Sequence, residues 1–414
     1  MTINEPLATK RPLRVGFLSP TAIIDPASGA SQSILTMLSS LVKHGVHSYA
    51  LTGTCFDSVH GNEISKYLSD QGLKLSKTKI GALPLWNGIY QGINMHMIYM
   101  QSQRRMTVTA LEESLFLDNA QDWLRQAKPD LIITFGGLLL DKAIMQTVQR
   151  MGIAVVFYLA NGSYGKRSTF ENVDLIITNS GGTAEFYRQK LKVNSINVGL
   201  FVDPSPMMVK SKEPKYVTFV NPQAEKGVTL FLKLVECAAK ELPEMKFLVV
   251  ESRAQLLPAL QRMNLPESLL VNVTTLPRQN DMRKVYELTK ILIMPSFWFE
   301  AAGRVLIEAT SNAIPVIATN RGGIPETLAG AGILLDIPKE CTTNYWHVPS
   351  KSELEPWWQS LKKLWEDKTY YEQQVQRAAE ASKKHSLENK TNHLGAVLQK
   401  ALSIRDERMQ KRSK

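Results

Sequence analysis

The sequence predicts an α/β protein of two domains, each with a parallel β-sheet that helices cover on both faces. The chain has 414 residues, more than the roughly 250–300 residues at which a single hydrophobic core stops growing. Short β-branched runs alternate with longer amphipathic stretches, which is the pattern of parallel sheets in α/β proteins. This series ends and starts again near the middle of the chain, so we expect two similar domains.

The first series of strands lies in the N-terminal half. We expect strands at residues 14–18, 47–51, 94–99, 131–135, 153–158 and 174–178. Residues 31–44 carry apolar side chains at helical spacing, and Gly45 follows where a left-handed helix C-cap is expected. The first domain therefore begins with a strand, a loop and a helix.

The second series predicts another sheet. We expect its strands at residues 216–220, 247–250, 270–273, 291–294, 315–318 and 332–335. A stretch rich in proline and charge, residues 202–214, separates the two series and is typical of an exposed linker. We place the domains at residues 1–206 and 207–384, followed by a C-terminal helix and basic tail at 385–414. The tail from residue 405 onward is expected to be too charged to pack.

Composition restricts the partners and the compartment. The net charge is +11, so the surface attracts anions such as nucleotide phosphates, an anionic membrane or a nucleic acid, although a solvated lysine-rich surface explains it equally. Cys55, Cys237 and Cys341 are far apart, so neither a disulfide framework nor a zinc site is expected. The N-terminus lacks the apolar stretch of a secretory signal, and no run approaches the ~20 residues that span a bilayer. We expect a cytoplasmic protein that meets a membrane, if at all, from the surface of its inner face.

Residues 295–309 are the most informative stretch. They follow a predicted buried strand, and in an open α/β sheet the loop after a strand faces the ligand while the next helix offers unpaired N–H groups. Glu300 can accept hydrogen bonds from sugar hydroxyls, and Glu308 lies about two helical turns further on. Small side chains let a ligand approach this backbone closely; they are Ala301, Ala302 and Gly303. Helix capping and a solvated helix face would explain two glutamates without a ligand.

This stretch resembles the signature of two glutamates separated by seven residues in family 4 retaining glycosyltransferases. The resemblance continues through residues 312–318 and Gly322-Gly323-Ile324-Pro325-Glu326, and it is strongest between residues 216 and 335. It implies the GT-B architecture, in which two doubly wound, Rossmann-like domains face a central cleft. It also implies that a hexose-type sugar moves from a nucleotide diphosphate sugar to an acceptor.

The resemblance assigns roles to single residues. It implies that Glu300 and the amides after it contact the transferred sugar and that Glu308 holds the nucleotide ribose. Lys226, after the strand at 216–220, would neutralise the leaving diphosphate. Gly322 and Gly323 would lie against the donor, although a tight turn before a helix would explain both glycines without a ligand.

The sequence departs from the family pattern near the phosphates. Many relatives carry an arginine five residues before the lysine, where this chain has Asn221, and we nominate Arg304 to replace that cation. We group Asn221 and Gly227 with the donor-binding residues. Many relatives also place a histidine where this chain has Ala160 and Asn161. Front-side retention tolerates this loss, because the leaving phosphate oxygen can act as the base.

The first domain should bind the acceptor. Ser28 and Gly29 stand just before a predicted helix and, with Asn161, form a candidate acceptor or phosphate loop. Residues 83–105 combine aromatic and basic side chains, which suits a lipid acceptor at an anionic membrane or a nucleic acid. An ordinary hairpin edge is the alternative reading, and we do not expect nucleic acid as a partner.

No metal or cofactor is expected beyond the nucleotide sugar, because no Asp-x-Asp pair follows a strand in a suitable position. Charge that grows on the diphosphate would be stabilised by Lys226, the helix start after Glu300 and Arg304. Two alternatives remain, because fold does not fix function. One is a non-catalytic nucleotide-sugar-binding scaffold, and the other is a nucleotide-sugar epimerase or phosphorylase.

Overall fold

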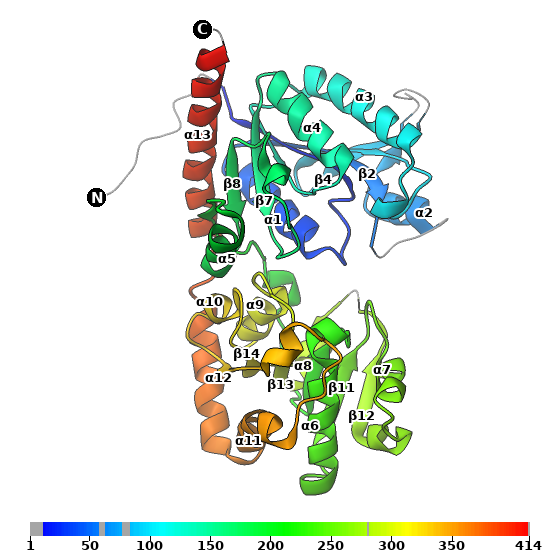
Figure 1. Ribbon diagram of the computed structural model, residues 1–414, viewed down its shortest axis with the longest axis vertical. Helices are drawn as coiled ribbons and strands as arrows, with labels where there is room; N and C mark the ends of the chain where they lie inside the picture. The colour runs from blue at the N-terminus through cyan, green and yellow to red at the C-terminus, as the bar shows by residue number, and fades with distance from the viewer. Residues whose placement is uncertain (1–10, 58–62, 77–82, 280, 413–414) are drawn as a thin grey trace, which may run out of the picture. The chain divides into compact units, whose positions relative to one another are not determined.

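The structure is a computed structural model that describes residues 11–57, 63–76, 83–279 and 281–412 (Figure 1). The chain forms two compact units. Unit 1 comprises Met1–Asn179, Ala184–Val202 and Leu387–Lys414, and unit 2 comprises Ser180–Thr183 and Asp203–Ser386. Each unit has a β-sheet with helices packed against it, which confirms the predicted fold class.

The described part of unit 1 holds a nine-stranded sheet in the order β3-β4-β5-β2-β1-β6-β7-β8-β9. Its strands are β1 (Arg14–Thr21), β2 (His47–Cys55), β3 (Lys74–Leu75), β4 (Leu85–Tyr90), β5 (Ile93–Ile98), β6 (Leu131–Thr134), β7 (Ala154–Leu159), β8 (Leu175–Thr178) and β9 (Ile196–Asn197). The helices are α1 (Gly29–Lys43), α2 (Glu63–Asp70), η1 (Arg105–Thr107), α3 (Ala110–Ala127), α4 (Leu139–Arg150), η2 (Arg167–Phe170), α5 (Gly181–Leu191), which belongs to unit 1 from Ala184 onward, and α13 (Leu387–Arg412). The pairings from β5 to β9 are parallel, and all six predicted strands of this series are present with slightly different ends.

The segment at 83–105 begins with a β-hairpin, which is the alternative to a lipid- or nucleic-acid-binding surface for its aromatic residues. Strands β4 and β5 pair antiparallel, and their turn residues Gln91 and Gly92 have φ values of 50° and 80°. Two successive left-handed residues are typical of the type I′ turn, whose twist matches that of the strands. Trp86 is buried and belongs to the core of unit 1.

The predicted first helix is confirmed as α1. Ser28 caps it, because its Oγ accepts a hydrogen bond from the backbone N–H of Ser31 at 3.3 Å. The helix ends at Lys43, and Gly45 has a φ of 80°, the left-handed conformation expected after a helix end. The apolar positions pack against the sheet; they are Ile34, Leu35, Met37, Leu38 and Leu41.

The described part of unit 2 holds a six-stranded, fully parallel sheet in the order β12-β11-β10-β13-β14-β15. Its strands are β10 (Tyr216–Val220), β11 (Lys246–Val250), β12 (Val273–Leu276), β13 (Thr289–Met294), β14 (Val316–Thr319) and β15 (Ile333–Leu335). The helices are η3 (Ser205–Met207), η4 (Ala224–Lys226), α6 (Val228–Glu241), α7 (Leu256–Arg262), η5 (Glu267–Asn272), α8 (Arg283–Leu288), α9 (Arg304–Ser311), α10 (Ile324–Leu328), η6 (Lys339–Thr342), α11 (Lys351–Glu366) and α12 (Lys368–Ser382).

One predicted strand of unit 2 is misplaced. The apolar run at 270–273 lies mostly in η5, and β12 begins only at Val273. Pro266 starts this helical turn, which buries Leu269 but leaves Val271 82% exposed. A run of apolar residues therefore does not identify a strand when a proline a few residues before it starts a helical turn.

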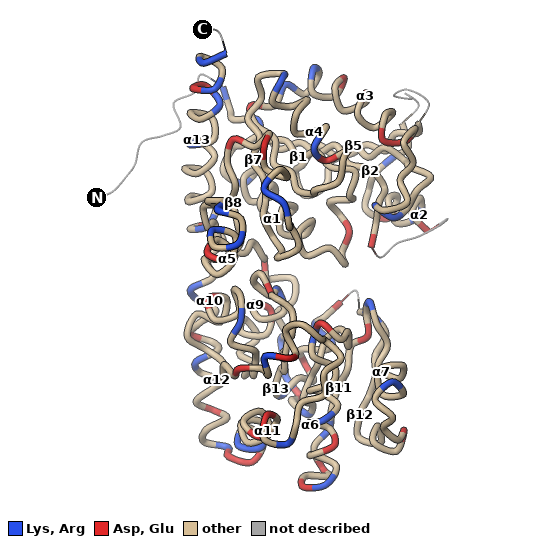
Figure 2. Tube along the Cα trace, viewed as in Figure 1, with Lys and Arg blue, Asp and Glu red and all other residues tan. Residues whose placement is uncertain are grey.

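The charged C-terminus packs on unit 1, so the prediction that the tail from residue 405 stays unpacked is wrong as far as Arg412. Helix α13, which carries several Lys and Arg at its end (Figure 2), lies against strand β7 and helix α1. Arg408 donates to the Asp174 carboxylate at 2.7 Å, and Arg405 donates to the carbonyl of Asp130 at 3.2 Å. The basic side chains can pack because they pair with acceptors at the edge of the sheet. Within the described chain, none of the helices is long and apolar enough to cross a membrane.

Candidate functional site

Lys226 is placed by the loop that follows β10. It ends η4, and Gly227 then has a φ of 83° before α6 begins at Val228. A Cβ at Gly227 would overlap the carbonyl oxygen of Pro295, so this glycine lets the loop approach the segment after β13. The carbonyl of Glu225 also accepts from the N–H groups of Phe297 and Trp298 at 2.9 and 3.1 Å. Because β10 and β13 are adjacent parallel strands, their following loops meet at one edge of the sheet.

Lys226 and Glu300 are in direct contact at this edge. Lys226 Nζ lies 2.5 Å from Glu300 Oε2, and the two side chains are 21% and 13% exposed. The same oxygen accepts from Trp298 Nε1 at 2.8 Å, and Ser296 Oγ lies 3.4 Å away. The Lys226 ammonium also lies 5.0 Å from the centre of the Trp298 ring, within range of a cation–π interaction.

These neighbours keep Glu300 ionised. Burial raises the pKa of the Glu300 carboxyl, but the charge of Lys226 and the hydrogen bonds from Lys226, Trp298 and Ser296 outweigh it, so the net pKa is lowered. At neutral pH the site therefore contains a carboxylate and an ammonium that share one short contact.

The double glycine supports the backbone of the Glu300 loop. The N–H of Gly323 donates to the carbonyl of Glu300 at 2.9 Å. A Cβ on Gly322 would overlap this same carbonyl oxygen, and one on Gly323 would overlap that of Ala301. Ser180 Oγ donates to the Ala301 carbonyl at 2.6 Å. Gly322 has a φ of 62°, and α10 begins at the residue after Gly323. The two glycines therefore form a tight turn before a helix, the alternative that explains them without a ligand.

The small residues after Glu300 are mostly enclosed. Ala301 and Ala302 are 5% and 1% exposed. Gly303 has a φ of 88° and caps α9, a conformation that L-residues rarely adopt. The first turn of α9 therefore follows Glu300 closely, as the sequence predicts.

Glu308 lies in a second cluster on α9. It is 5% exposed, and its Oε2 accepts from the hydroxyl of Tyr286 at 2.5 Å. Arg304 Nη2 lies 3.6 Å from Oε1 of the same carboxylate. Burial raises the pKa of Tyr286 well above its ordinary value, and the charge of Glu308 raises it further, so the phenol stays protonated and donates.

The two polar residues near the expected phosphate position contact other groups of the protein. Arg304 pairs with Glu308, and its buried Nη1 has no hydrogen-bond partner among the described residues. Asn221 has a φ of 64°, and its side chain donates to Gln223 at 2.8 Å and accepts from the N–H of Arg253 at 3.2 Å. A phosphate contact by Arg304 or Asn221 stays a prediction.

The candidate residues of unit 1 serve the nearby backbone. Ser28 caps α1, and Gly29 is the first residue of that helix. Asn161 accepts from the N–H of Ser163 at 2.9 Å, and its carbonyl accepts from the hydroxyl of Tyr187 at 2.8 Å. Ser28 and Asn161 follow β1 and β7, whose carboxyl ends lie at the same edge of the sheet.

Trp298 and Tyr286 contact the two glutamates but are not among the residues predicted from the sequence. Trp298 lies within the 295–309 stretch, two residues before Glu300. Its position in the sequence could therefore have indicated a contact with that carboxylate. Tyr286 lies in the predicted segment between two strands and carries no such signal. Its contact with Glu308 depends on how α8 packs against α9.

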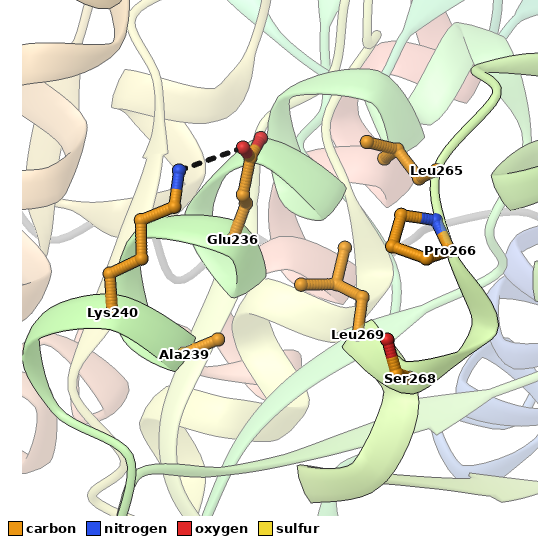
Figure 3. Close-up of a pocket in the computed structure, with 7 residues that line it drawn as sticks. All are labelled: Glu236, Ala239, Lys240, Leu265, Pro266, Ser268 and Leu269. Carbon is orange, nitrogen blue, oxygen red and sulfur yellow. Dashed lines mark hydrogen bonds and ion pairs between the residues drawn. The ribbon is translucent and has the colours of Figure 1, made fainter.

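Two cavities of the described chain are lined by other residues. One of about 260 Å³ in unit 2 lies between α6 and η5 (Figure 3). It is lined by Glu236, Ala239, Lys240, Leu265, Pro266, Ser268 and Leu269. Another of about 440 Å³ is lined by Ser69, Gly72, Leu73, Lys74, Leu75 and Trp86 in unit 1. The described residues contain no cluster of three or more His, Cys, Asp or Glu that could hold a metal ion.

Residues 208–384 match the family model of the group 1 glycosyl transferases. This match covers most of unit 2, including Lys226, Glu300 and Glu308. A search among curated proteins found no match.

Solved structures resemble the chain over almost its whole length. A glycosyltransferase from Rickettsia africae ESF-5 matches with a TM-score of 0.66 and 15% identity, covering 94% of this chain and 98% of its own. Sucrose-phosphate synthase from Thermosynechococcus elongatus matches with a TM-score of 0.66 and 14% identity, covering 94% and 99%. Anabaena HepE in complex with UDP-glucose matches with a TM-score of 0.64 and 13% identity, covering 93% and 99%. At these identities the likeness shows the GT-B fold, and together with the family match it supports a glycosyltransferase.

Proposed function

We propose that this protein is a retaining glycosyltransferase that moves a hexose-type sugar from a nucleotide diphosphate sugar to an acceptor. The observation that carries the proposal is the contact of 2.5 Å between Lys226 and Glu300 at the carboxyl ends of two adjacent parallel strands. This edge of a parallel sheet is where α/β proteins bind nucleotides. Both residues also lie inside the segment that matches the glycosyl transferase family model.

UDP is the first nucleotide that we propose for the donor. HepE of Anabaena was solved with UDP-glucose and with UDP and glucose, and the pneumococcal O-GlcNAc transferase GtfA was solved with UDP and GlcNAc. Starch synthase IV of Arabidopsis thaliana was solved with ADP and acarbose, which makes ADP the second candidate.

The chemistry follows from where negative charge develops. Glycosyl transfer breaks the bond between the anomeric carbon and an oxygen of the β-phosphate, and the electron pair remains on the leaving diphosphate. The Lys226 ammonium stabilises that charge, as preorganised cations do at sites of charge development. The diphosphate must compete with Glu300 for this ammonium. Glu300 would then accept from sugar hydroxyls while Trp298 Nε1–H holds its Oε2.

Retention requires no separate protein base. In front-side attack the acceptor hydroxyl gives its proton to the leaving phosphate oxygen, so the loop at Ala160 and Asn161 can lack a histidine. We also propose that no metal ion takes part, with Lys226, Arg304 and the first amides of α9 providing the positive charge instead. Turnover that a chelator abolishes and magnesium restores would contradict this part of the proposal.

The proposal is tested by incubating the protein with UDP-glucose, UDP-GlcNAc, GDP-mannose and ADP-glucose and measuring the nucleoside diphosphate released. We expect release from at least one donor, slowly when water is the acceptor. Binding without release would favour a non-catalytic scaffold. If none of the donors binds and none releases a nucleoside diphosphate, the proposed nucleotide-sugar site is contradicted.

A further inference from the structure

Glu308 is held by a side chain that cannot itself touch a ligand. Tyr286 lies on α8, is 0% exposed, and donates to Glu308 Oε2 at 2.5 Å. The two residues belong to different helices, and Tyr286 packs in an apolar cluster that includes Leu306 and Ala309 of the helix that carries Glu308. Because its hydroxyl is enclosed, any influence of Tyr286 on a ligand must pass through Glu308.

The contact fixes the carboxylate in one orientation. A buried phenol needs an acceptor, and a hydrogen bond from a hydroxyl to an ionised carboxylate is among the stronger ones in proteins. Oε2 faces Tyr286, and Oε1 lies 3.6 Å from Arg304 Nη2. The side chain of Glu308 therefore has a neighbour on each oxygen that opposes rotation.

We infer that Tyr286 is a positioning residue that makes the nucleotide site select ribose over deoxyribose, because it orients Glu308 toward the ribose hydroxyls. An ionised carboxylate offers about four lone-pair sites. Tyr286 takes one and Arg304 lies beside another, which leaves two for the neighbouring 2′- and 3′-hydroxyls of a ribose. The inference rests on the proposed function, in which Glu308 holds the ribose.

Selection against deoxyribose follows from an unpaired acceptor. A site built to accept from a hydroxyl rejects an analogue that lacks it, because a mostly buried carboxylate is then left with an empty acceptor position. This penalty is large only while Glu308 is prevented from turning to other donors. Removal of the Tyr286 hydroxyl should thus weaken UDP binding and leave binding of 2′-deoxy-UDP nearly unchanged.

The test compares dissociation constants for UDP and 2′-deoxy-UDP by titration calorimetry in the wild type and in Tyr286→Phe. We expect the wild type to prefer UDP by about tenfold or more, the size of one charged hydrogen bond, and Tyr286→Phe to prefer it by no more than about threefold. Tyr371→Phe is the matched control, since it removes a hydroxyl that donates to the Lys290 carbonyl at 3.2 Å in the same unit. It should keep the wild-type ratio.

A second variant tests the same orientation without changing the tyrosine. The Tyr286 hydroxyl needs an acceptor, so in Glu308→Gln the amide oxygen should face Tyr286 and the NH₂ group should face the ribose. This variant then cannot accept from both ribose hydroxyls. We expect it to lose the UDP preference as fully as Glu308→Ala. A Gln variant that keeps most of the preference would overturn the inference, even if Tyr286→Phe does not fold.

The remaining outcomes separate this inference from the proposed function. A folded Tyr286→Phe variant with the wild-type ratio, or a wild type that binds UDP without preferring it, would overturn the inference and leave the transferase intact. If UDP fails to bind, the GDP and ADP pairs replace it. Failure of all three nucleotides to bind the wild type would overturn the proposed function and this inference together.

Discussion

The candidate residues of unit 2 and those of unit 1 use their polar groups differently. In unit 2, ionised side chains that are 74 residues apart meet at the ends of adjacent strands, as Lys226 and Glu300 do. In unit 1, Ser28 and Asn161 bind backbone groups two or three residues away. Local contacts of this kind are explained by capping and turn formation. Neither helix capping nor turn formation requires a charged contact between the ends of two strands. We therefore expect the chemistry to depend mainly on unit 2.

The largest effect should come from Lys226→Ala. Loss of the cation at the leaving diphosphate should lower the rate of nucleoside diphosphate release by about 10²–10³-fold, as for other preorganised groups at sites of charge development. The measurement is release from the best nucleotide sugar under saturating conditions. Lys233→Ala is the control, because Lys233 pairs with Glu236 on α6 and is not a candidate site residue. An equal loss of release in both variants would contradict a specific role of Lys226 at the leaving diphosphate.

Gly323→Ala should disrupt the same region through its backbone. The new methyl group would overlap the carbonyl oxygen of Ala301, so the loop that carries Glu300 must move. We expect a loss of about 2 kcal/mol in unfolding free energy, together with a loss of turnover. Gly165→Ala in unit 1 is the control, since nothing lies within 4 Å of its Cβ position. A Gly323→Ala variant with wild-type stability and turnover would show that the close packing is not required.

Glu300→Gln should change how stability depends on acid. The pKa of Glu300 is lowered in the folded state, so its ionisation stabilises the fold above its ordinary value of 4.5, and this stabilisation is lost as the pH falls through the lower folded value. We expect the wild type to exceed Glu300→Gln in melting temperature by a constant margin above about pH 5, and by a shrinking margin below pH 4.5. A margin that stays constant down to pH 3 would contradict the ion pair with Lys226.

Ser28→Ala should have the smallest effect and would sharpen the contrast between the units. It removes the N-cap of α1 and should cost about 1 kcal/mol of unfolding free energy. Nucleoside diphosphate release in the absence of an acceptor should stay within about twofold of the wild type. Chemical denaturation and the release assay measure the two effects, and a large loss of release would mean that unit 1 takes part in the donor chemistry.

The alternation of short apolar runs predicted most of the fold, because it reports directly which segments are buried in a parallel sheet. The strand at 216–220 was predicted with its observed ends. The packing of α13 was missed because Arg408 meets Asp174, 234 positions away, and such a pair leaves no local pattern. Strand β12 was misplaced because Pro266 turns the chain before it.

The candidate site was predictable where a motif carried it. Three site residues were predicted, Glu300 and Glu308 from their spacing and Lys226 from its place after a strand. The structure brings Lys226 and Glu300 into contact. The roles of all three residues stay predictions. Tyr286 could not be named, since an isolated buried tyrosine looks like any core residue until its acceptor is known. The pair of Arg304 and Glu308, by contrast, has the four-residue spacing at which side chains of one helix meet, so the sequence could have indicated it.

The central claim is that Lys226 binds the terminal phosphate of the nucleotide, and the most direct test is the affinity that this phosphate adds. Dissociation constants for UDP and UMP should be measured by calorimetry with the wild type and with Lys226→Ala, or for the GDP or ADP pair if that nucleotide binds better. We predict that the wild type binds the diphosphate at least about tenfold more tightly than the monophosphate, and that Lys226→Ala loses most of this difference. A difference that survives unchanged in Lys226→Ala would contradict the account.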